Sequence, residues 1–335
     1  MKKLLLATAI AALSVSAAQA APTVYGKAFV TVDYEDIERN IGEDEDSLQI
    51  NSHASRIGFK GSEAMTANTD VIYQLEYGID IDADDSRTFA SRDTFLGLNN
   101  KNFGEFRFGR NQSSLDRINN VVTADGGYWD NLGSADNMVD SGRIDNSMIW
   151  TAPKYQGLPL QVSAMYAADE NDNGSDGFGV AAMFDQGTGF TAGVAYDKDV
   201  NLGNNYNLTD DGITGGDIIR GTATVDMSKF ASVPVTLGAL YQVADIDNTD
   251  KKEKGFVVSA AMGLQNFAKP ATVYAQYNNT SNLRGLDGID TDQIVVGGKY
   301  FYQPNMIMHA YAGQNDNDRN DKETLAIGGG LEYLF

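Results

Sequence analysis

Residues 70–82 read DVIYQLEYGIDID, in which apolar and polar side chains alternate almost without a break. Successive side chains of a β-strand point to opposite faces, so a period of two predicts a strand with one apolar and one polar face. The predicted apolar face carries Val71, Tyr73, Leu75, Tyr77, Ile79 and Ile81, with Ile72 as the main exception to the rule. The predicted polar face carries Asp70, Gln74, Glu76, Asp80 and Asp82.

The same alternation recurs along most of the chain, for example in Pro234–Ala244 and Leu325–Phe335. Beyond residue 20 no stretch shows a comparable period of 3.6 residues, which indicates an all-β fold. We count sixteen alternating segments, at residues 24–35, 48–61, 70–82, 91–100, 104–112, 145–155, 159–169, 177–186, 189–199, 217–228, 233–246, 255–265, 271–280, 291–302, 305–315 and 322–335.

The connections between these segments alternate in length. Long polar connections occupy Asp36–Ser47, Ser113–Ile144, Glu170–Asp176, Asn201–Gly216, Asp247–Lys254, Ser281–Asp290 and Asp316–Asp321. Short connections occupy Lys101–Phe103, Gln156–Leu158, Gly187–Thr188, Lys229–Ser232 and Gln303–Pro304. Short turns at one end and long loops at the other are typical of transmembrane β-barrels.

A closed barrel explains how an antiparallel sheet could lie in hydrocarbon, where every backbone N–H and C=O needs a partner. Closure removes the unpaired sheet edges. A barrel of about sixteen strands is too wide for side chains to fill, so it encloses water. The apolar faces are therefore expected to contact lipid and the polar faces to line an aqueous lumen. This accounts for a membrane protein whose mean hydropathy is only −0.31.

The first twenty residues have the features of a secretory signal peptide. Lys2 and Lys3 precede the apolar run Leu4–Val15, and Ala18-Gln19-Ala20 places small residues before the expected cleavage point. We therefore expect residues 1–20 to be removed and residues 21–335 to form the barrel. Because cleavage takes away two lysines, the formal charge of −21 would become −23.

Composition excludes several classes of protein. The chain has no cysteine, which excludes a disulfide scaffold or a thiolate metal site. Its acidity argues against nucleic-acid binding, which needs clustered Lys and Arg. Asp169–Gly174 resembles the start of a calcium-binding loop, but Val180 stands where the closing Glu is required. We expect no metal and no cofactor.

Short motifs connect the chain to a known family. These are Val24–Lys27, Ser55–Gly61, Phe103–Arg110, Asp145–Trp150 with Pro153–Tyr155, and the C-terminal Phe335. In their order and spacing, the chain resembles the general porins of Gram-negative outer membranes over nearly its whole length. The resemblance implies a sixteen-stranded antiparallel transmembrane barrel, a homotrimer in the outer membrane, contact with lipid and lipopolysaccharide, and passive diffusion of small hydrophilic solutes and ions.

The resemblance also implies that the third long loop, residues 113–144, folds into the barrel and narrows it. Acidic residues of that loop would face basic residues on the wall. The matching basic positions are Lys27, Arg56 and Arg92, with Arg143 as a fourth candidate, and the acidic candidates are Asp125 and Asp130. Alternation independently places Lys27 and Arg56 on the polar face of their strands. A Lys or Arg that faced lipid would also cost about 2–4 kcal/mol at mid-membrane.

Some assignments stay open at this stage. Asp93 is in phase with Phe95, which is predicted to face outward, so Asp93 would suit a subunit interface. Arg107 and Arg110 could serve either the pore or an interface. The high negative charge favours a channel that prefers cations to anions. An outer-membrane phospholipase or protease is an alternative function, although His53 and His309 are the only histidines and neither lies in a Ser-His pattern. A loop-mediated adhesin is a third.

Overall fold

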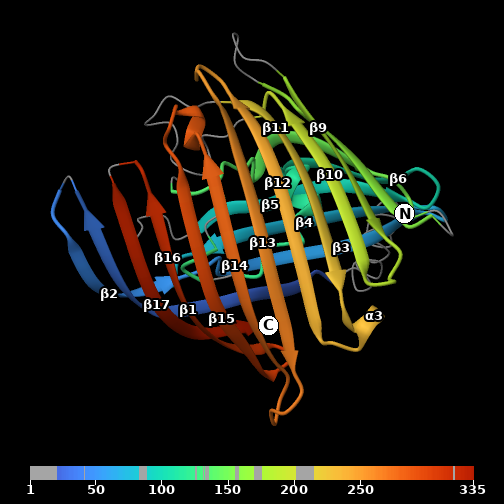
Figure 1. Ribbon diagram of the computed structural model, residues 1–335. Helices are drawn as coiled ribbons and strands as arrows, with labels where there is room; N and C mark the ends of the chain where they lie inside the picture. The colour runs from blue at the N-terminus through green and yellow to red at the C-terminus, as the bar shows by residue number, and fades with distance from the viewer. Residues whose placement is uncertain are drawn as a thin grey trace, which may run out of the picture.

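The computed structural model describes residues 21–40, 42–82, 89–124, 127–130, 132, 136–154, 158–169, 176–200, 215–319 and 321–335. One antiparallel sheet contains all the strands of this part of the chain. Each strand pairs with its neighbours in sequence, except that β2 and β3 both pair with β1. The first strand also pairs with the last, from Lys27 opposite Leu334 to Arg39 opposite Lys322, so the sheet closes into a barrel (Figure 1). The predicted closed all-β fold is confirmed.

The strands are β1 (Thr23–Arg39), β2 (Glu45–Ser52), β3 (Arg56–Thr66), β4 (Thr69–Ile79), β5 (Phe89–Asn100), β6 (Gly104–Gln112), β7 (Arg143–Thr151), β8 (Leu160–Ala167), β9 (Gly177–Asp185), β10 (Phe190–Lys198), β11 (Gly216–Asp226), β12 (Val235–Ile246), β13 (Lys252–Leu264), β14 (Ala271–Ser281), β15 (Thr291–Gln303), β16 (Met306–Asn317) and β17 (Lys322–Leu334). Short helical turns occur at η1 (Leu115–Ile118), α3 (Ser228–Ala231) and η3 (Leu283–Gly285). No helix in the described ranges is long and apolar enough to cross a membrane.

The strands β2 and β3 are two halves of one barrel position. Residues 30–37 of β1 pair with β2, and residues 23–27 of the same strand pair with β3. The break between the halves is fixed by Ser55, whose hydroxyl donates to the carbonyl of Phe29 at 3.2 Å and accepts from its N–H at 3.0 Å. Counted this way, the described residues form the sixteen barrel positions that the sequence predicts.

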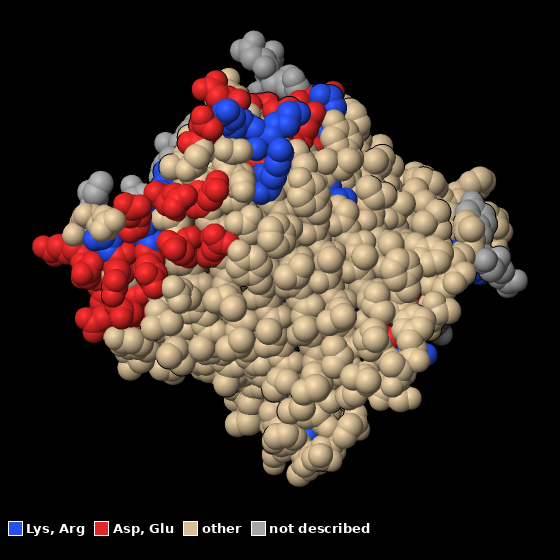
Figure 2. All heavy atoms as spheres, in the orientation of Figure 1, with Lys and Arg blue, Asp and Glu red and all other residues tan. Residues whose placement is uncertain are grey.

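The two faces of the sheet follow the alternation. Leu96 of β5 stands opposite Phe108 of β6, and both are exposed on the outside of the barrel. Thr31 and Asp33 of β1 are fully buried inside it. Charged residues gather at the end of the barrel that carries the long connections, while the wall below is uncharged over a broad band (Figure 2). Such a band matches the apolar belt of a membrane barrel.

The third loop, residues 113–142, folds into the barrel. Its η1 turn places Leu115 and Ile118 against inward-facing residues of the wall, including Ile149 and Ile218. Further along, Val121 and Met138 pack against β12 and β13, and Trp129 packs in a buried cluster with Tyr274 and Tyr311. The inward-folded loop is confirmed, and its apolar side chains bury part of the barrel wall that would otherwise contact water.

Hydrogen bonds fix the path of the third loop along the inner wall. The Gln276 side chain accepts from the backbone N–H of Thr123 at 2.8 Å, and Ser259 donates to the carbonyl of Val121 at 2.6 Å. On the return path, Gln242 donates to the carbonyl of Val139 at 2.6 Å. These polar side chains come from strands that face the loop, which explains why so many lumen-facing amides and hydroxyls are buried.

Candidate pore constriction

Three of the predicted basic residues form a row across neighbouring strands. Lys27 of β1 stands directly opposite Arg56 of β3 in the strand register. Arg56 in turn stands opposite Gly78 of β4. Because glycine has no side chain, Arg92 of β5 can lie over this position, with its Cδ 3.5 Å from where a Cβ of Gly78 would be. The row therefore lies at one level of the inner wall.

Glu76 of β4 joins this row together. Its Oε1 lies 2.8 Å from Nε of Arg92, and its Oε2 lies 3.7 Å from Nε of Arg56. Tyr25 donates its phenol hydrogen to the same Oε2 at 2.9 Å. Glu76 is only 7% exposed, so its charge is neutralised locally by the two guanidinium groups. The alternation placed Glu76 on the lumen face, but nothing in the sequence indicated that it holds both arginines.

Arg143, at the start of β7, extends the basic surface. Its Nε lies 2.6 Å from Oδ1 of Asp93. The expectation that Phe95 faces outward and Asp93 an interface is wrong. Phe95 is 7% exposed and lies under the guanidinium of Arg107, 4.4 Å from its ring centroid. The pairing of β4 with β5 shifts register next to Ser91. This bulge turns both Arg92 and Asp93 to the inside, whereas strict alternation would send one of two consecutive residues outward.

The two undecided arginines separate in the structure. Arg107 lies inside the barrel, where its Nε is 2.6 Å from Glu105. Arg110 stands opposite Thr94, as Phe108 stands opposite the outward-facing Leu96. Because Arg110 is two residues from Phe108 on the same strand, it faces outward too. There its Nη1 lies 2.6 Å from Oδ1 of Asp145.

The acidic candidates of the third loop have different outcomes. Asp125 lies outside the described residues. Asp130 is exposed, and its backbone N–H donates to the carbonyl of Gly127 at 3.1 Å. Two loop acids that were not among the sequence candidates, Asp116 and Asp140, are close enough to interact, and Asp116 also lies within electrostatic range of Arg143. Burial, together with the nearby carboxylate of Asp140, raises the pKa of Asp116 to about 7.

Aromatic residues hold the tip of the third loop. Trp129 is 2% exposed and donates its indole N–H to the carbonyl of Ala326 at 3.3 Å. The backbone N–H of Tyr128 donates to the Tyr311 hydroxyl at 3.2 Å. The Tyr128 hydroxyl donates to Glu35 of β1. The loop tip is therefore bonded to one side of the lumen, where β16, β17 and β1 lie next to one another.

The partners of the two histidines differ from those of a catalytic triad among the described residues. His53 Nε2 lies 2.7 Å from the Thr31 hydroxyl and 3.5 Å from Asp33 Oδ2, so hydroxyl and carboxylate share one ring nitrogen. In a catalytic triad they occupy opposite nitrogens. His309 contacts Glu332 at 2.9 Å and packs on the buried Phe29. Among the described residues, no three His, Asp or Glu side chains are grouped to hold a metal ion.

The fold and the lumen together define a class of protein. A closed barrel with an apolar outer belt, a charged inner wall and an inserted loop forms a channel across an outer membrane. Family comparison agrees: residues 6–320 match the Gram-negative porin family, and the chain belongs to it. It is an outer-membrane porin, which forms a water-filled channel for passive diffusion of small hydrophilic solutes and ions.

Individual relatives are more distant. The chain is 27% identical to a monosaccharide porin of Halomonas sp. and equally to the major outer membrane protein of Halomonas elongata, each over the whole of both chains. Among solved structures, an anion-selective porin from Comamonas acidovorans aligns with a TM-score of 0.77 at 17% identity, covering 94% of this chain and 100% of that one. OmpF of Salmonella typhi in complex with daunomycin aligns with a TM-score of 0.66 at 18% identity, covering 94% and 97%. At such identities the structural likeness shows the fold alone.

Proposed function

We propose that the channel is a non-enzymatic diffusion pore whose narrowest section lies between the basic row and the third loop. The observation that carries this proposal is the row itself: Lys27, Arg56 and Arg92 share one level of the inner wall, and Glu76 holds the two arginines. Arg143 extends the wall side, and Asp130 and the undescribed Asp125 are the loop acids assigned to the opposite side. Opposed charges across a narrow passage produce a transverse field that orders polar solutes and hinders apolar ones.

A weak preference for cations is part of the proposal. The long-loop end of β1, β16 and β17 carries an acidic rim around a single arginine, formed by Glu38, Arg39, Asp44, Asp316, Asp321 and Glu323. A negative rim raises the local concentration of cations before they reach the basic row. Because exposed charges are screened over about 8–10 Å at ordinary ionic strength, the preference should be modest.

A homotrimer is also proposed. The Arg110–Asp145 ion pair lies on the outer face, where a charge facing lipid would be costly. Contact with a second subunit would remove that cost. One of the solved structures similar in fold, OmpT of Vibrio cholerae, is described as a trimer form.

The deciding experiment is single-channel recording of the purified protein in a planar bilayer. Stepwise conductance, without hydrolysis of lipid or peptide by the same preparation, supports a non-enzymatic pore. Hydrolysis that stops when His53 is replaced would contradict it. Reversal potentials in a salt gradient test the ion preference, and an anion preference would refute the proposed one.

A further inference from the structure

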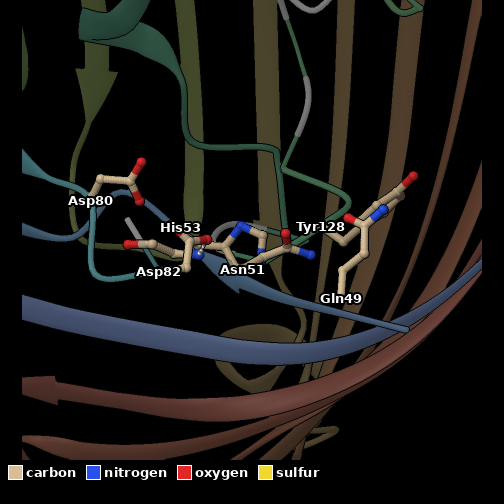
Figure 3. Close-up of a pocket in the computed structure, with 7 residues that line it drawn as sticks. Gln49, Asn51, His53, Asp80, Asp82 and Tyr128 are labelled. Carbon is tan, nitrogen blue, oxygen red and sulfur yellow. Dashed lines mark hydrogen bonds between the residues drawn. The ribbon is translucent and has the colours of Figure 1, made fainter. Parts of the chain in front are cut away.

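A polar pocket opens into the lumen between β2, the end of β4 and the tip of the third loop. It is lined by Gln49, Asn51, Ser52, His53, Asp80, Asp82 and Tyr128, which we call the acceptor pocket. Figure 3 shows these side chains inside the curved barrel wall, with Asp80 and Asp82 at one end and Tyr128 and Gln49 at the other. Its volume of about 400 Å³ lies within the range of small-molecule sites.

The two amides of the pocket have their nitrogens committed to the wall. Gln49 Nε2 donates to Glu35 Oε2 at 2.8 Å, and Asn51 Nδ2 donates to Asp33 Oδ2 at 2.8 Å. An amide whose nitrogen binds one way directs its carbonyl oxygen the other way. The amides therefore offer oxygen acceptors to a solute in the pocket.

Tyr128 and Ser52 also have their donors committed. The Tyr128 hydroxyl donates to Glu35, and the Ser52 hydroxyl donates to Ser55 at 3.1 Å. The backbone N–H of Ser52 donates to Asp82 Oδ2 at 2.7 Å, which fixes that carboxylate at the pocket wall. Carboxylates accept several hydrogen bonds each, so a solute here meets a surface of acceptors with net negative charge.

We propose that the acceptor pocket is a subsite for a hydroxylated organic cation, of which an amino sugar is the simplest example. An ammonium group offers three donors and a positive charge, and ring hydroxyls offer more donors to the amide oxygens. Among the residues that the structure describes, neither Lys nor Arg lines the pocket, so an anion finds no cationic side chain there. This inference rests on the proposed pore function, because the solute must reach the pocket through the lumen.

The test uses glucosamine, glucose and glucuronate, which have similar sizes and carry positive, zero and negative charge. Each is titrated against the current through the full-length protein in a bilayer, and the half-blocking concentration is measured. We expect glucosamine to block at the lowest concentration. The double variant Asp80→Asn with Asp82→Asn should raise its half-blocking concentration about tenfold, the effect of losing one charge-assisted hydrogen bond.

The matched control is Asp44→Asn with Asp321→Asn, which removes the same two charges from the acidic rim. An equal effect of both double variants would overturn the subsite, because general attraction by the rim would explain it. Equal block of the wild-type channel by all three sugars would overturn it too. Asp80→Asn alone keeps the Ser52 bond to Asp82, so it serves if the double variant fails to fold. A wild-type protein that does not conduct would instead overturn the proposed pore function.

Discussion

Glu76 and Arg92 form the closest ion pair of the basic row, with Oε1 of the carboxylate 2.8 Å from Nε of the guanidinium. The pair is largely buried, at 9% and 20% side-chain exposure. A buried carboxylate that binds two arginines fixes their positions and cancels part of their charge. Both the width and the field of the passage should therefore depend on this one acid.

Replacing Glu76 with Gln should shift the channel toward anions. The substitution keeps the size of the side chain and removes one negative charge, so the charges of Arg56 and Arg92 are no longer balanced. Loss of this buried charged hydrogen bond should destabilise the fold by about 1–3 kcal/mol. The reversal potential in a KCl gradient measures the shift. Glu45→Gln, which removes an exposed partner of Arg39, is the control; an equal shift there would contradict a special role for Glu76.

Replacing Arg92 with Ala should widen the pore. Glu76 keeps its bonds to Arg56 and Tyr25, so the wall should remain folded while the side chain over Gly78 disappears. We expect higher single-channel conductance and faster vesicle swelling with larger sugars. Arg39→Ala at the loop end should leave the swelling rate with these neutral sugars unchanged. If Arg92→Ala leaves sugar permeation unaltered, Arg92 does not line the narrowest section.

Replacing Trp129 with Ala should loosen the tip of the third loop. The indole is 2% exposed, and truncating such a side chain removes about 3–5 kcal/mol of packing. The expected result is increased current noise, because the tip can leave the buried cluster that contains Tyr274 and Tyr311. Trp150, the other tryptophan, donates to the carbonyl of Phe103 at the opposite, short-turn end. Trp150→Ala should therefore leave the noise as it is, and noise that rises equally in both variants would argue against tip anchoring.

Asp116 should make the cation preference depend on pH. Its pKa is raised to about 7 by burial and by Asp140, so the carboxyl is neutral at pH 6 and largely ionised at pH 8. The pore gains negative charge over this interval and should become more selective for cations. The same shift makes folding less favourable as pH rises from about 4 to 7, because only the unfolded chain ionises freely there. Reversal potentials at both pH values, compared with those of Asp116→Asn, test this; an identical pH response in the variant would exclude Asp116 as the source.

Replacing Arg110 with Ala should weaken the trimer. The substitution leaves Asp145 on the outer face without its 2.6 Å partner. We expect the oligomer band on unheated detergent gels to convert to monomer at a lower temperature than in the wild type. Arg107→Ala, which acts inside the barrel, should not change that temperature. An oligomer of undiminished thermal stability in Arg110→Ala would remove the ion pair from the interface.

The sequence by itself determined the barrel. A period of two over sixteen segments gives each strand one apolar and one polar face, and alternating connection lengths give the barrel its two different ends. These signals are local, so they could be read without knowing which strands meet. They also placed Lys27, Arg56 and Glu76 on the inner face, because phase along a strand decides that.

Only the tertiary structure decided what the inner face does. Lys27 meets Arg56 through strand register, and Glu76 reaches Arg92 past a bulge that breaks the alternation. The path of the third loop depends on contacts with strands more than a hundred residues away, such as the hydrogen bond from Trp129 to Ala326. Contacts between distant segments follow from how the closed sheet brings its strands together. No local pattern in the chain encodes which of these distant residues will meet.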